Sequence, residues 1–245
     1  LGRGEGQPEA EAPQHHGGTD VAAVPRRLLF RVFQGAELSL GACETNYGTI
    51  NTGLANGKFD GSMYEYFQAN HYDWDSLVLM IDRAGLKDVF TGERAGYEKI
   101  TFFGPTNNTI RLWMYKSEQR WDPDLGQIVV IKKAYQRVDE IPVEDCHRLV
   151  MEHVVKGVYM RDDIPEGTLS ETGTREGGTT LTGVEGNSFW IYSYRGQYQG
   201  IQGQGAVSLK LVSEIGQEIK VASSNLESDN GVVHSLHYDY PLGTL

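Results

Sequence analysis

The sequence has little of what several classes of protein require. Only two residues are cysteines, Cys43 and Cys146, so it offers neither a disulfide framework nor a cysteine-rich metal site. No apolar run approaches the ~20 residues that a membrane-spanning helix needs. Lysine and arginine total 22 against 33 acidic residues and are scattered, which excludes nucleic acid as a partner. A membrane link is expected only through an anchor.

The usual catalytic signatures are also missing. A Gly-x-Ser-x-Gly turn does not occur, and the glycines of residues 200–205 lack both the lysine and the following helix of a phosphate loop. Cys146 and His147 are adjacent on an expected helix, so their side chains point ~100° apart and cannot act as nucleophile and base. We therefore expect a protein that is not an enzyme and has no cofactor.

The N-terminal part has the composition of an unfolded leader. Residues 1–42 begin with a segment rich in Gly, Glu, Pro, Gln and His, and large apolar side chains are scarce there. Leu-Gly-Ala-Cys at residues 40–43 is similar to a bacterial lipobox, which would make Cys43 a lipid anchor. The alternative is a chance match, since polar residues interrupt the preceding apolar stretch. Residues 43–61 are then a linker, and the expected location is the cell envelope.

From residue 62 the pattern predicts a folded domain of the α+β class. Apolar side chains recur at helical spacing around residues 63–67 and 77–84, after Thr106, and over residues 143–154. Strands are expected at residues 100–103, 158–160, 179–181, 188–194, 206–212, 218–222 and 232–237. Residues 117–141 are polar and interrupted, except for an apolar run at 128–131 that is suited to an extra strand, and are interpreted as an insertion or embellishment.

Three segments give the domain its most specific features. Residues 100–108, Ile-Thr-Phe-Phe-Gly-Pro-Thr-Asn-Asn, predict a buried strand followed by a helix that Thr106 or Asn107 would cap. Residues 229–237, Asp-Asn-Gly-Val-Val-His-Ser-Leu-His, predict a tight turn and an apolar strand. Residues 149–159 contain His-Val-Val-Lys-Gly at the end of the last helix.

The order and spacing of these segments resemble the fasciclin (FAS1) domain over residues 62–245. The resemblance implies a β-wedge or sandwich flanked by short helices, and adhesion to a protein or glycan at the cell surface as the function. Glu152 stands where the family normally has a tyrosine, and Gly104 where alanine is usual. A lipobox with one such domain also resembles envelope lipoproteins of Bacteroidetes-type bacteria. The family-motif positions are Thr101, Phe102, Phe103, Pro105, Thr106, Asn107, His153, Asn230, Gly231, Val233 and His234.

His153 and His234 are the residues that an enzyme hypothesis would use. Both have apolar neighbours, which favours core positions with ring nitrogens bonded to the backbone. The alternative, a zinc site completed by a carboxylate, lacks the i, i+4 histidine spacing of a helical metal site.

A second functional hypothesis comes from four aromatic residues. Trp190, Tyr192 and Tyr194 alternate on one face of an expected strand, and Tyr198 follows in a Gly- and Gln-rich loop. If exposed, they would form a flat surface suited to stacking on sugar rings. The alternative is that they pack inside the domain.

Overall fold

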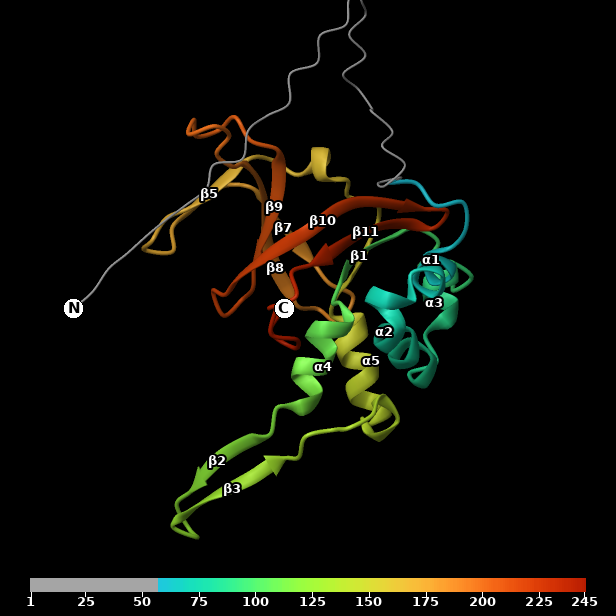
Figure 1. Cartoon of the computed structure of the whole chain (residues 1–245), viewed down its shortest axis with the longest axis vertical. Helices are drawn as coiled ribbons and strands as arrows, with labels where there is room; N and C mark the ends of the chain where they lie inside the picture. Colours follow the sequence, from blue (N-terminus) through green and yellow to red (C-terminus); the bar gives the residue numbers. More distant parts are fainter. Residues whose placement is uncertain (1–56) are drawn as a thin grey trace, which may run out of the picture. The chain divides into compact units, whose positions relative to one another are not determined.

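The computed structural model describes residues 57–245 (Figure 1). Cys43, the expected leader and most of the expected linker lie outside these residues. The helices are α1 (Met63–Ala69), α2 (His71–Arg83), α3 (Lys87–Thr91), α4 (Asn107–Tyr115) and α5 (Val143–Met151), with 3-10 turns η1 (Val138–Glu140) and η2 (Arg161–Asp163). No helix in this part of the chain is long and apolar enough to cross a bilayer.

One seven-stranded sheet organises the domain, in the order β4-β1-β11-β10-β9-β8-β7. Its strands are β1 (Ile100–Gly104), β4 (Val154–Lys156), β7 (Thr179–Thr182), β8 (Ser188–Arg195), β9 (Val207–Val212), β10 (Glu218–Ser228) and β11 (Gly231–Leu236). Only β1 and β11 pair in parallel; the other neighbours are antiparallel. The amide of Val184, just after β7, donates to the carbonyl of Val154 at 2.9 Å and so joins the two ends of the sheet.

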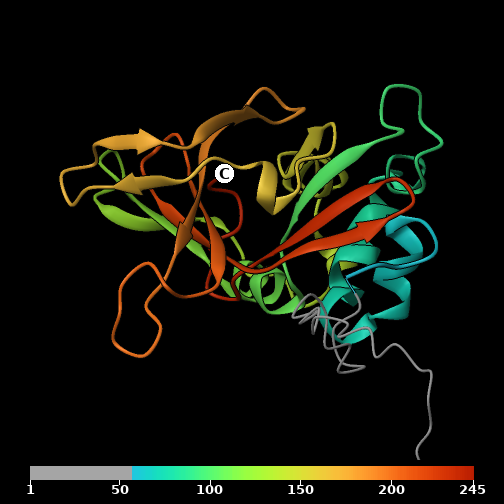
Figure 2. The same ribbon diagram turned by 90° about the horizontal axis from the view of Figure 1, so that it is seen from above.

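The helices gather beside the β1 and β11 part of the sheet (Figure 2). Ser62 and Glu65 form a capping box that starts α1 and directs its apolar face inward. Phe67 of α1, Phe90 of α3 and Phe102 of β1 then meet with ring centroids 5.0–5.9 Å apart. This aromatic cluster fixes the helices to the sheet and confirms the α+β prediction.

Two close backbone approaches explain the glycines of the motif segments. A Cβ on Gly104 would lie 2.6 Å from the Trp74 ring of α2, so the indole occupies the space that an alanine would need. A Cβ on Gly231 would lie 1.8 Å from the carbonyl oxygen of Ile100, its partner on β1, and Gly231 has φ +146°. The parallel pairing of β1 with β11 therefore requires glycine at position 231.

Several predicted elements were wrong in extent. The helix expected over residues 143–154 ends at Met151, and the strand expected at 158–160 is instead β4, which lies earlier in the chain. β10 continues through Ser228, six residues past its expected end. The patterns also missed α3 and the small hairpin of β5 (Gly167–Leu169) and β6 (Arg175–Gly177).

The region expected as an insertion contains a second hairpin. β2 (Glu118–Asp122) and β3 (Gln127–Lys132) pair with each other and with no strand of the seven-stranded sheet. They extend away from α4 and α5, and Figure 1 shows the hairpin standing clear of the rest of the domain. The apolar run at 128–131 is part of β3, as the sequence predicted.

Candidate interaction surface

The first motif segment is part of the core. Thr101, Phe102 and Phe103 are fully buried on β1, and Pro105 is buried where the strand turns into α4. The Thr101 hydroxyl donates to the carbonyl of Gly157 at 2.8 Å and accepts from the amide of Tyr159 at 2.9 Å. These contacts tie the chain beyond β4 to β1, so Thr101 has a structural role.

α4 begins where the sequence predicted, but the expected side-chain cap is wrong. Thr106 is the N-cap residue, but neither its side chain nor that of Asn107 caps the helix. Asn107 instead reaches α2, where its Oδ1 accepts from the Ser76 amide at 2.7 Å and its Nδ2 donates to the Tyr72 carbonyl at 2.8 Å. The Asn107 amide therefore joins the start of α4 to the first turns of α2.

His153 is buried, as predicted, but not on a helix face. It lies two residues past α5, and its Nδ1 is 2.7 Å from the carbonyl oxygen of Leu149 in the last turn of that helix. Its Nε2 is 3.0 Å from the hydroxyl of Tyr240. Burial lowers the pKa of His153 to about 3, so the ring is neutral and ties α5 to the C-terminal segment.

His234 is also a core residue, in agreement with the prediction. Its Nε2 lies 2.9 Å from the carbonyl oxygen of Tyr159, and the Asn225 amide donates to its Nδ1 at 3.4 Å. The ring stacks on Phe103 with centroids 5.3 Å apart. Burial lowers the pKa of His234 to about 4.

Asn230 joins the β10–β11 turn to two helices. Its Oδ1 accepts from the amide of Met63 at 2.7 Å, and its Nδ2 donates to the carbonyl of Phe90 at 3.0 Å. Val233 is buried on the next strand and pairs with Phe102. The motif residues thus hold the domain together. Within residues 57–245, no group of three or more histidine, cysteine or acidic side chains is arranged to hold a metal ion.

Glu152 is an unusual buried acid. It is 6% exposed, its Oε2 pairs with Arg148 at 3.3 Å, and its Oε1 has no hydrogen-bond partner among residues 57–245. Burial raises its pKa to about 7. Glu152 stands at the position where the resemblance places a tyrosine, so position 152 has no hydroxyl. The hydroxyl that His153 contacts belongs to Tyr240, which is far along the chain.

The aromatic residues of β8 do not form an exposed face. Trp190 and Tyr192 are both 4% exposed and stack with centroids 4.5 Å apart, and Tyr194 is half-buried. The indole donates to the carbonyl of Gly177 at 3.1 Å, and the Tyr192 hydroxyl donates to Glu218 at 2.9 Å. Only Tyr198 is exposed, which removes the flat surface on which the glycan hypothesis depended.

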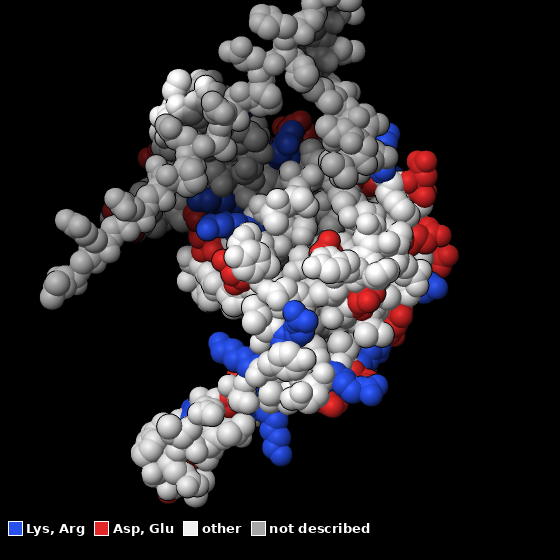
Figure 3. Space-filling model, viewed as in Figure 1, with Lys and Arg blue, Asp and Glu red and all other residues white. Residues whose placement is uncertain are grey.

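The largest concentration of exposed apolar side chains lies on the β2–β3 hairpin. We define the hairpin surface as the five large residues there that are each between 54% and 63% exposed: Trp121, Leu125, Ile128, Val130 and Ile131. Trp121 and Ile128 face each other across the two strands. On the face shown in Figure 3, uncharged side chains cover most of the hairpin, and basic side chains gather where the hairpin meets the helices.

A cleft of about 760 Å³ adjoins the base of the hairpin, between α4, α5 and the C-terminal segment. Trp113 and Tyr135 stack on its wall with centroids 5.8 Å apart, and the Lys132 ammonium lies 3.1 Å from the centroid of Trp113. Burial lowers the pKa of Lys132. This cation–π contact and the ring stack fix the hairpin base to α4.

A model of the fasciclin domain family matches residues 73–238. The chain belongs to the fasciclin family. Among solved structures it is similar to a FAS1 domain pair from the insect cell adhesion molecule fasciclin I, with 14% sequence identity and a TM-score of 0.41. That similarity covers 69% of this chain and 46% of the other, so the chain spans less than half of that structure. Among curated proteins, none matched.

Fasciclin domains are generally non-catalytic binding modules. Most fasciclin motif residues of this chain are buried in its scaffold; Thr106 and Asn107 are half-buried, and the side chain of Asn107 is bonded to α2. The exposed hairpin is the better candidate, and sequence reasoning did not select it as a site. The available signal was the run Ile-Val-Val-Ile at 128–131, which was interpreted only as an extra strand.

Proposed function

We propose that this fasciclin domain is a cell-surface adhesion and interaction module, carried on a bacterial envelope lipoprotein and anchored by a lipid on Cys43. Family membership supports a binding role. The observation that carries the proposal is the hairpin surface, which leaves five large apolar side chains exposed on a projecting element. A contiguous apolar surface of this kind is typical of protein contact sites. The proposed partner is therefore a protein at the cell surface or in the extracellular matrix.

Adhesion is tested with beads that carry the full chain. We expect more beads to resist flow on surfaces coated with extracellular-matrix protein or with envelope protein than on albumin. Beads carrying an Ile215→Lys chain should behave like the wild type, because Ile215 is exposed on a turn between β9 and β10, outside the hairpin. Retention of wild-type beads at the albumin level on every surface would contradict the adhesion role.

Anchoring is tested separately by changing Cys43 to alanine in a bacterial host. The wild-type chain should fractionate with membranes and carry an acylated Cys43 as its new N-terminus by mass spectrometry. The Cys43→Ala chain should move to the soluble fraction, whereas a Cys146→Ala chain should stay with the membrane because Cys146 is buried in the core. A membrane-bound Cys43→Ala chain would contradict the anchor.

A further inference from the structure

The β2–β3 hairpin has edges that no strand of residues 57–245 covers. β3 reads Gln-Ile-Val-Val-Ile-Lys, with four consecutive β-branched residues and no charge before Lys132. Exposed edges usually carry a charge, a proline or a bulge that prevents pairing with another chain. Residues 127–131 contain no charge and no proline, and the register shift between β2 and β3 lies at Ile131, so residues 127–130 form a regular edge. Short uncharged segments of high β-propensity are the ones that pair with copies of themselves. β3 thus has the features of a pairing strand.

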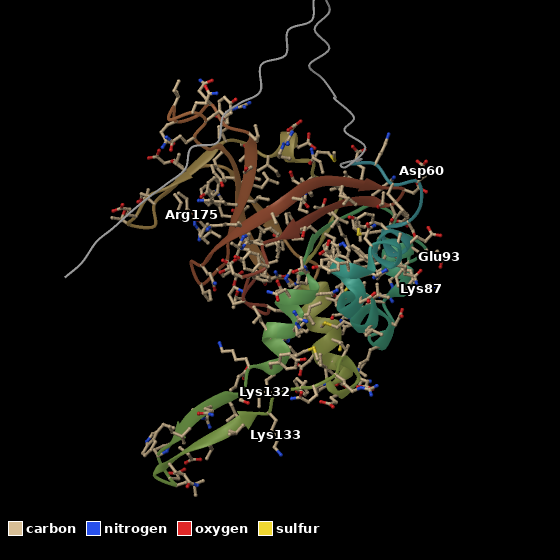
Figure 4. All side chains as sticks on the ribbon, viewed as in Figure 1. Asp60, Lys87, Glu93, Lys132, Lys133 and Arg175 are labelled. Atoms are coloured by element: carbon tan, nitrogen blue, oxygen red, sulfur yellow. The ribbon has the colours of Figure 1, made fainter. Side chains whose placement is uncertain are left out.

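The charges of the hairpin are segregated along its length. Asp122 and Asp124 lie at the tip, where Asp122 Oδ1 accepts from the amides of Asp124 and Leu125 and fixes the turn. Lys132 and Lys133 lie at the base, as Figure 4 shows. Glu118 is also at the base, 3.8 Å from the Lys132 ammonium, so Lys133 supplies the unbalanced positive charge of the hairpin there. Two such hairpins placed side by side in opposite directions bring the acidic tip of each next to the basic base of the other. The hairpin is therefore complementary in charge to a second copy of itself.

We infer that β3 pairs with β3 of a second copy, antiparallel about a two-fold axis, to give a four-stranded sheet. With Val129 on the axis, Ile128 of each copy lies opposite Val130 of the other, and β-branched cross-strand pairs of this kind are favourable. In this register Lys133 lies opposite Leu125 of the other copy and therefore next to its Asp124. The inference rests on the proposed function, since it names a partner for the hairpin surface. A second copy is favoured over an unrelated strand because the charge pattern complements itself.

The first test is sedimentation velocity on the full, unlipidated chain over a range of concentrations. The wild type should form a reversible dimer. Ile128→Lys should weaken dimerisation by at least ~10-fold, because it places a charge in the paired edge. Ile215→Lys makes the same chemical change at a residue that is 75% exposed outside the hairpin, and it should leave the dissociation constant unchanged. A wild type that stays monomeric up to ~100 µM would overturn the inference.

The second test exchanges the charges and does not depend on how one variant folds. Asp124→Lys and Lys133→Asp should each sediment as monomers, since each places like charges at both contacts of its own dimer. An equimolar mixture of the two should dimerise again, because both contacts then join opposite charges. Salt should weaken the wild-type dimer. A mixture that remains monomeric, or variants that dimerise as well as the wild type, would contradict the antiparallel arrangement.

These results separate the two proposals. Dimers in solution without bead retention on any coated surface would support pairing between copies and contradict adhesion to matrix or envelope proteins. Bead retention by a protein that remains monomeric would support adhesion and overturn pairing between copies.

Discussion

At the residue scale, several polar side chains join elements that are distant along the chain. The sequence predicted that His153 and His234 are in the core, because apolar residues surround each of them. It did not give their partners, since the Tyr240 hydroxyl and the Tyr159 carbonyl come from elements distant along the chain. The same limit explains the error at Asn107, whose amide bonds to a helix more than thirty residues earlier.

Glu152 gives the domain a pH-dependent stability. Its folded pKa, raised to about 7, exceeds the ordinary value of 4.5, so the folded state binds more protons than the unfolded state between these values. Its contribution is complete below pH 4.5 and is lost as the pH rises through 7. The free energy of unfolding of Glu152→Gln should therefore rise relative to the wild type by ~1–3 kcal/mol between pH 5 and 8.

Urea unfolding at a series of pH values measures this difference. Glu171→Gln is the matched control, because Glu171 is exposed in a loop. A Glu152→Gln difference that is the same at pH 5 and pH 8 would show that the carboxyl group does not titrate in the folded protein. His153 and His234 act in the opposite sense, since their lowered pKa values remove stability as the pH falls below 6.5.

Adjacent asparagines allow a second test at this scale. Asn107→Ala should lower the free energy of unfolding by ~1–3 kcal/mol, because it removes the hydrogen bonds from Asn107 to the Ser76 amide and the Tyr72 carbonyl, which join α4 to α2. Asn108→Ala should cost less than ~0.5 kcal/mol, since the side chain of Asn108 makes two bonds that are both exposed: it donates to the Tyr238 carbonyl at 3.2 Å and accepts from Arg111 at 3.5 Å. Denaturant titration of both variants makes the comparison, and equal losses would contradict the proposed role of Asn107.

At the element scale, periodicity found most elements but not their ends. The helical pattern was extended to residue 154 because Val154 is apolar and correctly spaced, yet Val154 is buried on β4. The helix stops at Met151, and the His153 ring then approaches the Leu149 carbonyl that one more helical turn would have used. The contact between the His153 ring and the Leu149 carbonyl does not change the spacing of apolar residues, so the sequence pattern did not show where α5 ends.

The hairpin is expected to be an independent element. A shortened chain can be made by replacing residues 119–131 with an Asn-Gly turn that joins Glu118 to Lys132. The removed residues are mostly exposed, and the contact between Lys132 and Trp113 is kept. The free energy of unfolding should then stay within ~1 kcal/mol of the wild type. Thermal unfolding followed by circular dichroism gives the comparison, and a loss of several kcal/mol would show that the hairpin belongs to the folding core.

At the scale of the whole molecule, the sequence predicted the fold class and the family, and the parallel pairing of β1 with β11 places its two main motif segments side by side in one core. It did not predict which surface is available for binding. The alternation of aromatic residues on β8 was compatible with both an exposed and a buried face. In the structure the face is buried, because the Trp190 indole donates to the carbonyl of Gly177 and the Tyr192 hydroxyl donates to the carboxylate of Glu218. Exposure of an apolar run depends on what packs against it, so the hairpin surface became evident only in three dimensions.

The division between a buried motif scaffold and an external hairpin is tested most directly by bead retention with the shortened-hairpin chain, measured together with its unfolding temperature. The account predicts an unfolding temperature close to that of the wild type and retention reduced to the albumin level. A shortened chain that folds normally and still holds beads as well as the wild type would contradict it, because the contact surface would then lie elsewhere.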